Sequence, residues 1–220
     1  MKKIIITGFA FAAILASCGG GENKIESETA KEVHVSEVKS TTQTFKTIKE
    51  GSVVKWMGSH LAGVGAHNGT VNVKDGEVVV NDGKIDNATF TIDMTSIHTF
   101  DYDKGTEDYT DLVGHLSNHE FFDVSKYATV SFGLTNVEAI EGDFNSKVTG
   151  NLTILGVERS ITFNANITVS DNEVTIKSQP FTIDRTQWGV EYNKEGTVDL
   201  NPDFIISNEI TFTIETSVVK

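Results

Sequence analysis

The fold class is decided by one stretch, Ile161-Thr162-Phe163-Asn164-Ala165-Asn166-Ile167-Thr168-Val169. Every second residue is apolar, and the residues between them are threonine or asparagine. Because successive side chains of a β-strand point to opposite faces, this alternation predicts a strand with one apolar face and one polar face. Two-faced strands are typical of antiparallel sheets, whereas the strands of a parallel α/β core are apolar on both faces.

The same alternation recurs from Phe45 to the C-terminal end of the chain, in about eight or nine runs. Asn81-Asp82-Gly83 predicts a turn, and Lys74-Asp75-Gly76 predicts a hairpin between two of the runs. The pattern therefore predicts one all-β domain, a closed antiparallel barrel of about eight strands, with room for core side chains or one small ligand. Apolar positions of the main runs are Val54, Trp56, Val71, Val73, Val78, Val80, Phe90, Ile92, Met94, Val130, Phe132, Leu134, Val148, Leu152, Ile154, Val174, Ile176, Phe181, Ile183, Phe204, Ile206, Ile210, Phe212 and Ile214.

One stretch, Asp108–Phe122, departs from this alternation. Leu112 and Leu116 are four residues apart, the spacing of one face of a helix. The stretch lies between the run that ends at Met94 and the run that begins at Val130. We therefore expect the barrel to carry one short helical excursion.

The first 17 residues have the pattern of a bacterial export signal. Lys2 and Lys3 precede an apolar run from Ile4 to Leu15, which has the length of a signal-peptide core and is too short to span a bilayer. The run ends in Leu-Ala-Ser-Cys18, which resembles the lipobox of bacterial lipoproteins. The sequence thus predicts a lipoprotein signal peptide over 1–17 and an acylated Cys18 that anchors the protein to a membrane.

Residues 18–43 are predicted to be the acylated cysteine and a flexible tether. Gly19-Gly20-Gly21 is followed by many charged and few apolar residues, which cannot bury enough surface to fold alone. Val33-His34-Val35 alternates weakly, and a strand there is left open. The folded domain is predicted to cover residues 44–220.

The net charge argues against a nucleic-acid partner, and the cysteine content excludes an intrachain disulfide. Removal of the signal peptide takes two of the 18 Lys and Arg residues and none of the 31 acids, which changes the net charge from −13 to −15. A polyanion needs a cationic surface, so no nucleic-acid partner is expected. Cys18 is the sole cysteine, which rules out an intrachain disulfide.

A membrane-spanning β-barrel is the main alternative to a barrel with an apolar interior. Such a barrel also alternates, but its apolar residues face lipid and its aromatic residues form two girdles. In this chain the aromatic residues scatter along the strands, and a lipid anchor would be redundant for a spanning barrel. We therefore expect the apolar faces to point into the barrel.

Four segments, in the same order along the chain, resemble those of YceI-like proteins. His115-Leu116-Ser117-Asn118-His119-Glu120-Phe121-Phe122-Asp123-Val124 is similar to the family's HL-x-S-x-x-FFD signature, and Val148-Thr149-Gly150-Asn151-Leu152-Thr153-Ile154-Leu155-Gly156-Val157-Glu158-Arg159 is similar to its V-x-G-x-LTI-x-G-V-x-R segment. Ser52–Gly58 resembles the opening strand, and Asp184–Gly189 resembles the R-x-x-[FW]-G element. The resemblance covers roughly Phe45 to Val219.

The resemblance implies a lipocalin-like, extended antiparallel β-barrel whose tunnel holds an isoprenoid chain, such as a quinone tail or a polyprenyl lipid. No other cofactor is implied. The alternation leaves open whether each apolar side chain is packed core or ligand wall. The candidate wall residues are Trp56, Phe90, Ile92, Met94, Leu116, Phe121, Phe132, Leu134, Leu152, Ile154, Phe163, Phe181 and Trp188.

Two kinds of metal site have partial signals and a catalytic nucleophile has none, and none of the three is expected. His115 and His119 have the spacing of zinc ligands on a helix, but no H-E-x-x-H motif or cysteine accompanies them. Asp101-Tyr102-Asp103-Lys104-Gly105 resembles a calcium loop, yet its twelfth position is Leu112 instead of a glutamate. No G-x-S-x-G motif marks a nucleophile, so an enzyme is not expected.

Three functions remain after these exclusions. The first is binding of an isoprenoid lipid for sequestration, transport or stress protection in the cell envelope. The second is binding of another amphipath such as a fatty acid, and the third is a structural envelope lipoprotein with a filled barrel. Gly19, where an aspartate would favour inner-membrane retention, places the anchor in the outer membrane facing the periplasm. The oligomeric state stays open, with a homodimer among the alternatives.

Overall fold

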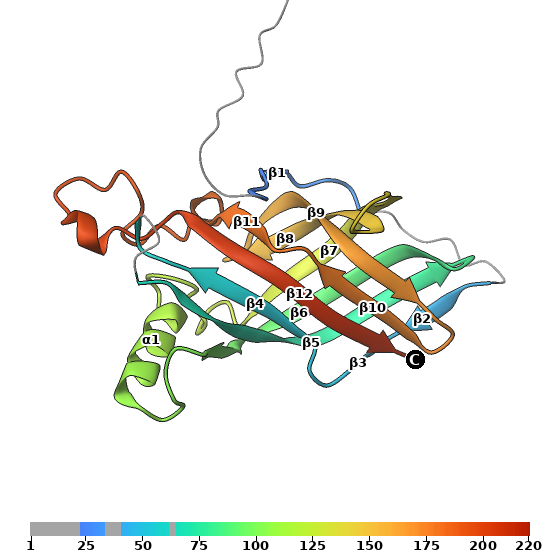
Figure 1. Ribbon diagram of the computed structural model, residues 1–220, viewed down its shortest axis with the longest axis horizontal. Coiled ribbons are helices and arrows are strands. Elements are labelled where there is room, and N and C mark those ends of the chain that lie inside the picture. The colour runs from blue at the N-terminus through green and yellow to red at the C-terminus, as the bar shows by residue number, and fades with distance from the viewer. Residues whose placement is uncertain (1–22, 34–40, 62–64) are drawn as a thin grey trace, which may run out of the picture.

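The computed structural model describes residues 23–33, 41–61 and 65–220, and eight strands of this part form a closed antiparallel barrel (Figure 1). Along the barrel the order is β9-β10-β12-β4-β5-β6-β7-β8, and pairing of β8 with β9 closes it. The barrel strands are β4 (Val53–Gly58), β5 (His67–Asn81), β6 (Lys84–Thr99), β7 (Thr129–Ala139), β8 (Ser146–Ile154), β9 (Val157–Val169), β10 (Glu173–Ser178) and β12 (Glu209–Val219).

Four short strands complete the sheet. β2 (Gln43–Phe45) pairs with β5, and β3 (Thr47–Ile48) pairs with β12. Because β4 also lies between β5 and β12, these two short strands fill the place in the wall beyond the start of β4. β11 (Phe181–Asp184) follows a break at Pro180 and pairs with β12 beyond the end of β10. β1 (Glu28–Thr29) pairs with β9 in the same sheet.

The described part of the chain has one α-helix, α1 (Glu107–Ser117), between β6 and β7. The short 3-10 helices η2 (Arg185–Trp188) and η3 (Pro202–Phe204) precede β12 at the same end of the barrel (Figure 1). Within the described residues, no helix is long and apolar enough to cross a membrane. The structure thus confirms the predicted lipocalin-like, extended antiparallel barrel with one helical excursion.

Local turn chemistry was predictable at one hairpin and misleading at another. Asp82 and Gly83 have positive φ angles of 52° and 76° and connect β5 to β6, as the tight-turn pattern predicts. The hairpin predicted at Lys74-Asp75-Gly76 is wrong, because β5 runs straight through it. The register against β6 shifts between Val73 and Asp75, so these residues form a bulge within one long strand.

The start of the last strand also differs from the sequence-based expectation. Alternation places Phe204 in a continuous run with Ile206 and Ile210, but it lies in η3 and is 57% exposed. β12 begins only at Glu209. The 3-10 turn follows from Pro202 at its first position and from Asn201, whose side chain accepts a hydrogen bond from the Asp203 backbone N–H.

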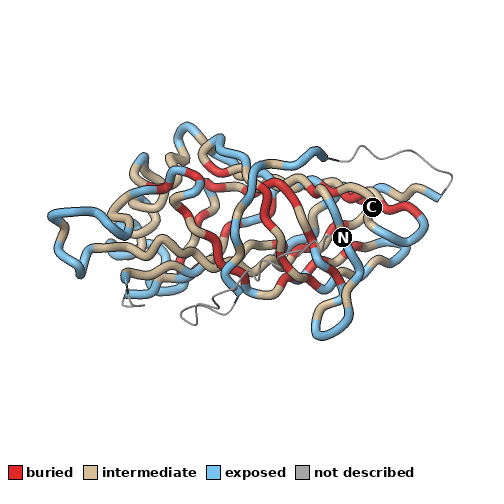
Figure 2. The backbone as a smooth tube through the Cα atoms, turned by 90° about the horizontal axis from the view of Figure 1, so that it is seen from above, coloured by how far each residue is buried: buried red, intermediate tan, exposed pale blue. Residues whose placement is uncertain are grey.

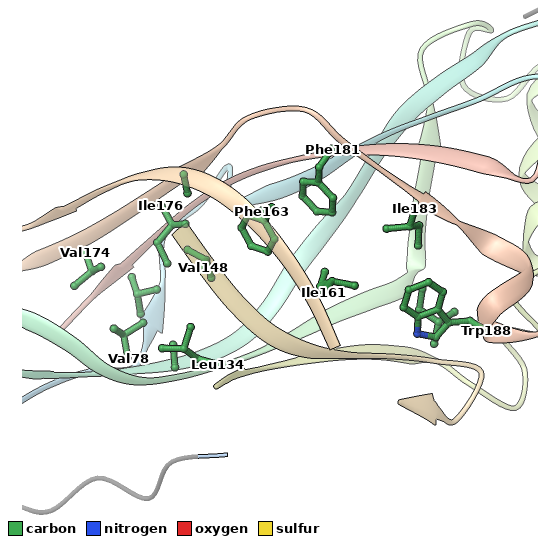
Figure 3. Close-up of a cluster of buried hydrophobic side chains, with 14 of the residues drawn as sticks. Val78, Leu134, Val148, Ile161, Phe163, Val174, Ile176, Phe181, Ile183 and Trp188 are labelled. Atoms are coloured by element: carbon green, nitrogen blue, oxygen red, sulfur yellow. The ribbon is translucent and has the colours of Figure 1, made fainter. Parts of the chain in front are cut away.

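Most of the buried core lies inside the barrel (Figure 2). Figure 3 shows side chains from several strands meeting there, among them Phe163 of β9 and Phe181 of β11. The two rings stack with centroids 4.7 Å apart and planes 8° apart. The apolar residues of the stretch Ile161–Val169 face this core, which confirms their predicted common face.

Residues 23–33, which belong to the segment predicted to be a tether, make hydrogen bonds to the barrel. Ile25 N–H donates to the Thr182 carbonyl at 2.8 Å, and Glu28 and Thr29 pair with β9. Farther on, the Asn151 side chain exchanges hydrogen bonds of 2.9 Å and 2.7 Å with the backbone of Lys31. These contacts fasten the segment to the outer wall of the barrel. Cys18 lies outside the described residues, as do His34 and Val35.

Candidate functional site

The barrel interior holds a cavity of about 340 Å³ at the end where α1 lies. Inward-facing residues of most barrel strands form its wall, together with α1 and the segment between η2 and β12. Most of the lining side chains are aliphatic or aromatic, so removal of an apolar guest from water favours binding. Small-molecule sites in proteins have volumes of about 300–1,000 Å³, a range that includes this cavity.

Nine of the predicted wall residues line this cavity. They come from strands on all sides of the barrel and from the segment 116–121 at the end of α1. The nine are Trp56, Ile92, Met94, Leu116, Phe121, Phe132, Leu152, Ile154 and Phe181. Strand alternation therefore assigned the interior face correctly at the seven strand positions, and the role of all nine residues in binding stays a prediction.

The other four predicted wall residues lie elsewhere. Phe90, Leu134 and Phe163 line a second, smaller void of about 60 Å³. Trp188 lines neither void: its ring is fully buried and its Nε1–H donates to the Leu152 carbonyl at 3.0 Å. Trp188 lies in η2, where strand alternation does not apply.

A narrow ring of four side chains separates the two voids. Val54, Ile92, Phe132 and Ile214 line both of them. A chain that enters the larger cavity would have to pass this ring to reach the smaller void.

Sequence reasoning missed several wall residues, for two different reasons. Ile210, Phe212 and Ile214 belong to the alternating run in β12, so the same signal that marks Trp56 could have identified them. Tyr192 and Phe204 lie in the irregular segment before β12, where no periodic pattern marks the inward face.

Helix α1 covers one side of the cavity. It begins after Thr106, whose hydroxyl accepts a hydrogen bond from the Tyr109 N–H at 3.3 Å and so caps the first turn. The Tyr109 hydroxyl lies 3.0 Å from Nδ1 of His98 on β6, which ties the helix to the barrel. Leu112 and Leu116 line the cavity one helical turn apart.

Arg185 organises the irregular segment that lines the cavity between η2 and β12. Its guanidinium donates four hydrogen bonds to the backbone carbonyls of Val190, Tyr192, Ile206 and Ser207, at 2.7–3.1 Å. Burial lowers the pKa of Arg185, although the nearby carboxylates of Asp184, Glu195 and Glu191 oppose that shift. The side chain therefore acts as a clamp that holds two stretches of the irregular segment together.

Among the described residues, no group of three histidine, cysteine or acidic side chains could hold a metal ion. His115 Nε2 lies 3.0 Å from a carboxylate oxygen of Glu120, and its ring contacts Phe121 and Tyr192 edge-on. His119 is exposed. The two histidines therefore do not converge on one site.

Asp101 has a structural role in the loop whose sequence resembles a calcium site. Its carboxylate accepts hydrogen bonds from the Asn68 backbone and side chain and from the Thr99 hydroxyl, and it lies 3.1 Å from His67. Burial by itself raises the pKa of Asp101, but the hydrogen bonds outweigh it and hold the pKa below its usual value. Asp101 thus fastens the end of β6 to the start of β5.

Comparisons with known proteins agree with this fold. A family model described as the YceI-like domain matches residues 45–218. The crystal structure of BcnA from Burkholderia cenocepacia is 21% identical, with a TM-score of 0.52, and the match covers 76% of this chain and 95% of that one. A polyisoprenoid binding domain from Saccharophagus degradans, implicated in plant cell wall breakdown, is 14% identical, with a TM-score of 0.54 and coverage of 80% and 99%. A search of curated proteins gives no match.

Proposed function

Because this chain belongs to the family of YceI-like domain proteins, we propose that its barrel binds an isoprenoid lipid, such as a quinone or a polyprenyl lipid, in the 340 Å³ cavity. The observation that carries the proposal is the wall itself, which is mostly aliphatic and aromatic, together with a second apolar void on the other side of Phe132. The similar domain from Saccharophagus degradans is described as polyisoprenoid binding, which agrees with this ligand class.

The energetics favour a long apolar chain. Burial of apolar surface stabilises a complex by about 25 cal/mol per Å², or roughly 0.8 kcal/mol for each CH₂ group. Binding would sequester the chain from water, which suits storage, transport or protection of such a lipid in the cell envelope. The protein's role in this proposal is therefore to bind the lipid without changing it chemically.

We further propose that an acylated Cys18 anchors the barrel to the outer membrane on its periplasmic face. The support is the signal-peptide pattern of the first 17 residues and the lipobox-like residues that end at Cys18. Two or more acyl chains hold a protein firmly on a membrane, whereas one chain gives only marginal binding.

The decisive experiment is extraction of lipid from protein purified from its native host, followed by mass spectrometry. An isoprenoid lipid in stoichiometric amount would support the proposal. A fatty acid or other amphipath in the extract would show that the ligand is not an isoprenoid, and an extract without lipid would favour a structural protein. A mock purification from host cells that lack the protein serves as the blank.

A further inference from the structure

Exposed apolar side chains lie side by side at the end of the barrel that carries α1. Met57, near the end of β4, is 49% exposed, and Phe100, directly after β6, is 58% exposed. Asn68 of β5 pairs with Met57 on one side, and on the other its carbonyl accepts a hydrogen bond from the Phe100 N–H at 3.0 Å. Because paired residues of neighbouring strands share one face of a sheet, and Trp56 faces the cavity, Met57 and Phe100 both point outward.

This row of apolar side chains continues into the segment before β12. The Leu61 N–H donates to the Ile205 carbonyl at 2.9 Å, which places Leu61 next to Phe204, and both side chains are exposed. Figure 1 shows the end of β4 and the segment before β12 at the same end of the barrel. Met57, Leu61, Phe100 and Phe204 are called the apolar rim below. Single exposed apolar residues are common, whereas a group of them marks an interaction site.

The apolar rim borders the opening of the larger cavity. Phe204 and Gly65 line that cavity and are also exposed, so the cavity reaches the protein surface between η3 and the start of β5. Met57, Leu61 and Phe100 do not line the cavity. Their exposure therefore does not follow from a role in the wall and indicates contact with something outside the barrel.

The N-terminal segment meets the barrel at the same end. Lys24 Nζ pairs with Glu209 at 2.6 Å, and Glu209 lines the cavity two residues before Thr211, the partner of Met57 in β12. Lys24 lies six residues after Cys18, and six residues span at most about 22 Å when fully extended. Under the proposed acylation of Cys18, a bilayer therefore lies within about 22 Å of the cavity opening.

The charge beside the rim identifies the kind of partner. Residues 101–108, directly after Phe100, carry four acids and one lysine, and all eight residues are exposed. Two copies of the chain that met through this rim would bring these acidic segments together, and anionic lipids would be repelled in the same way. Neutral headgroups add no such repulsion, and the apolar side chains gain by leaving water. A bilayer surface with neutral headgroups is therefore the partner that fits.

We propose that the apolar rim inserts into the headgroup layer of the bilayer that holds the anchor and places the cavity opening against the lipid. The proposal rests on the proposed lipid binding and adds the surface through which a lipid would enter. A lipid would then reach the cavity without crossing water. A few side chains give only weak and reversible docking, so the proposed anchor is still needed to hold the protein on a washed membrane.

The test measures docking without an acyl chain. The chain from residue 18 onward, with Cys18→Ala, is mixed with extruded phosphatidylcholine vesicles at increasing lipid concentration, and flotation gives the bound fraction. We expect partitioning that becomes about tenfold weaker or more in the triple variant Met57→Ser/Leu61→Ser/Phe100→Ser, because burial of even one large apolar side chain changes an equilibrium by about this factor. Phosphatidylglycerol vesicles should bind the unmutated rim less tightly than phosphatidylcholine vesicles.

Val33→Ser is the matched control. It also removes an exposed apolar side chain, but Val33 lies over Gly133 in the middle of β7, on the side of the barrel. We expect its vesicle binding to equal that of the unmutated chain. Because the three substituted rim residues lie outside the cavity wall, the triple variant should bind the fluorescent probe N-phenylnaphthylamine from solution as the unmutated chain does. Leu61→Ser alone is a second variant, for use if the triple variant does not fold.

The outcomes separate docking from lipid binding. Failure of the unmutated chain to bind phosphatidylcholine vesicles, or equal binding by a folded rim variant, would overturn the docking proposal even if protein from the native host carries isoprenoid. A dimer in sedimentation equilibrium that the rim substitutions convert to a monomer would show that the rim joins two copies, which also overturns it. If protein from the host carries no lipid, the proposed function fails, and flotation still decides whether the rim docks.

Discussion

The phenyl ring of Phe132 on β7 lies over Gly150 on the neighbouring strand β8, where a Cβ atom would come within 2.2 Å of the ring's Cζ. The backbone carbonyl of Gly133 would be only 2.7 Å away. Glycine at this position is therefore what leaves room for the Phe132 ring, which lines both voids.

We predict that Gly150→Ala lowers the free energy of unfolding by about 1–3 kcal/mol, because the added methyl group overpacks the space under Phe132. Gly150→Val should be more damaging, and its effect on folding should exceed its effect on lipid binding. Urea unfolding measures the stability of both variants, and their lipid content measures binding. Gly114→Ala, in α1 with open space around its Cα, is the control and should stabilise by up to about 1 kcal/mol. An unchanged urea midpoint for Gly150→Ala would show that Phe132 can move away from the added methyl group without loss of stability.

Phe132 and Phe163 form a matched pair for separating ligand wall from packed core. Phe163 is 3% exposed and stacks on Phe181, so Phe163→Ala should cost about 3–5 kcal/mol in the delipidated protein. Phe132 borders cavity space on two sides, so Phe132→Ala should cost less and should weaken lipid retention. Denaturant unfolding and lipid content are measured on the same preparations. Equal losses of stability with unchanged lipid content would argue for a barrel filled by its own side chains.

Arg185→Lys should destabilise the protein by roughly 2 kcal/mol or more. Lysine keeps the charge, but its single nitrogen cannot reach the four carbonyls that the guanidinium satisfies. Hydrogen exchange should show the largest loss of protection at Ile206 and Ser207, whose backbone N–H groups donate to the carbonyls of Asn193 and Ser59. Protection that stays at the wild-type level there would mean that the segment is held by other contacts.

Acid should remove the stabilising contribution of Asp101. Its pKa in the folded protein lies below the usual value, so the unfolded state binds more protons as the pH falls. The contribution is fully present above about pH 4, the ordinary pKa of an aspartate, and is lost as the pH falls through the lower, folded value. The stability difference between wild type and Asp101→Asn should therefore shrink below about pH 4. A difference that is constant down to about pH 2 would contradict this assignment.

Cys18→Ala should release the protein from membranes and leave the barrel folded, because the described barrel residues make their contacts without Cys18. Fractionation after a high-salt wash tests the first part, and circular dichroism tests the second. Continued pelleting of the variant with membranes would contradict the proposed lipid anchor.

The residues that alternate strictly made the barrel predictable. Ile161, Phe163 and Ala165 indicate their strand without help from distant parts of the chain, because the two-residue period is a local property. The turn at Asp82 was equally local. By contrast, Asp75 and Gly76 have the chemistry of a turn, yet pairing with a long β6 on one side keeps them within β5. Tertiary pairing decided that case, and no local pattern reveals it.

The site was predictable only where it is built from strands. Trp56, Phe132 and Leu152 follow from alternation, whereas Tyr192 reaches the cavity because Arg185 fixes the course of an irregular segment. The surroundings of the Trp56 indole could not be predicted either. A lone tryptophan in a strand says nothing about which atoms will meet its indole, since that depends on Gly69 and Phe212 from other strands.

The fastening of residues 23–33 to the barrel limits how far the protein could travel from its anchor. Thr182 N–H donates to the Asn23 carbonyl at 3.1 Å, so the wall contacts begin five residues after Cys18. Five residues span at most about 18 Å when fully extended. Under the proposed acylation, the barrel would sample only a thin layer beside one bilayer. Delivery of the lipid to a distant membrane would then depend on a second carrier that reaches the barrel. Exchange of lipid with the bilayer that holds the anchor would not require the protein to leave that bilayer.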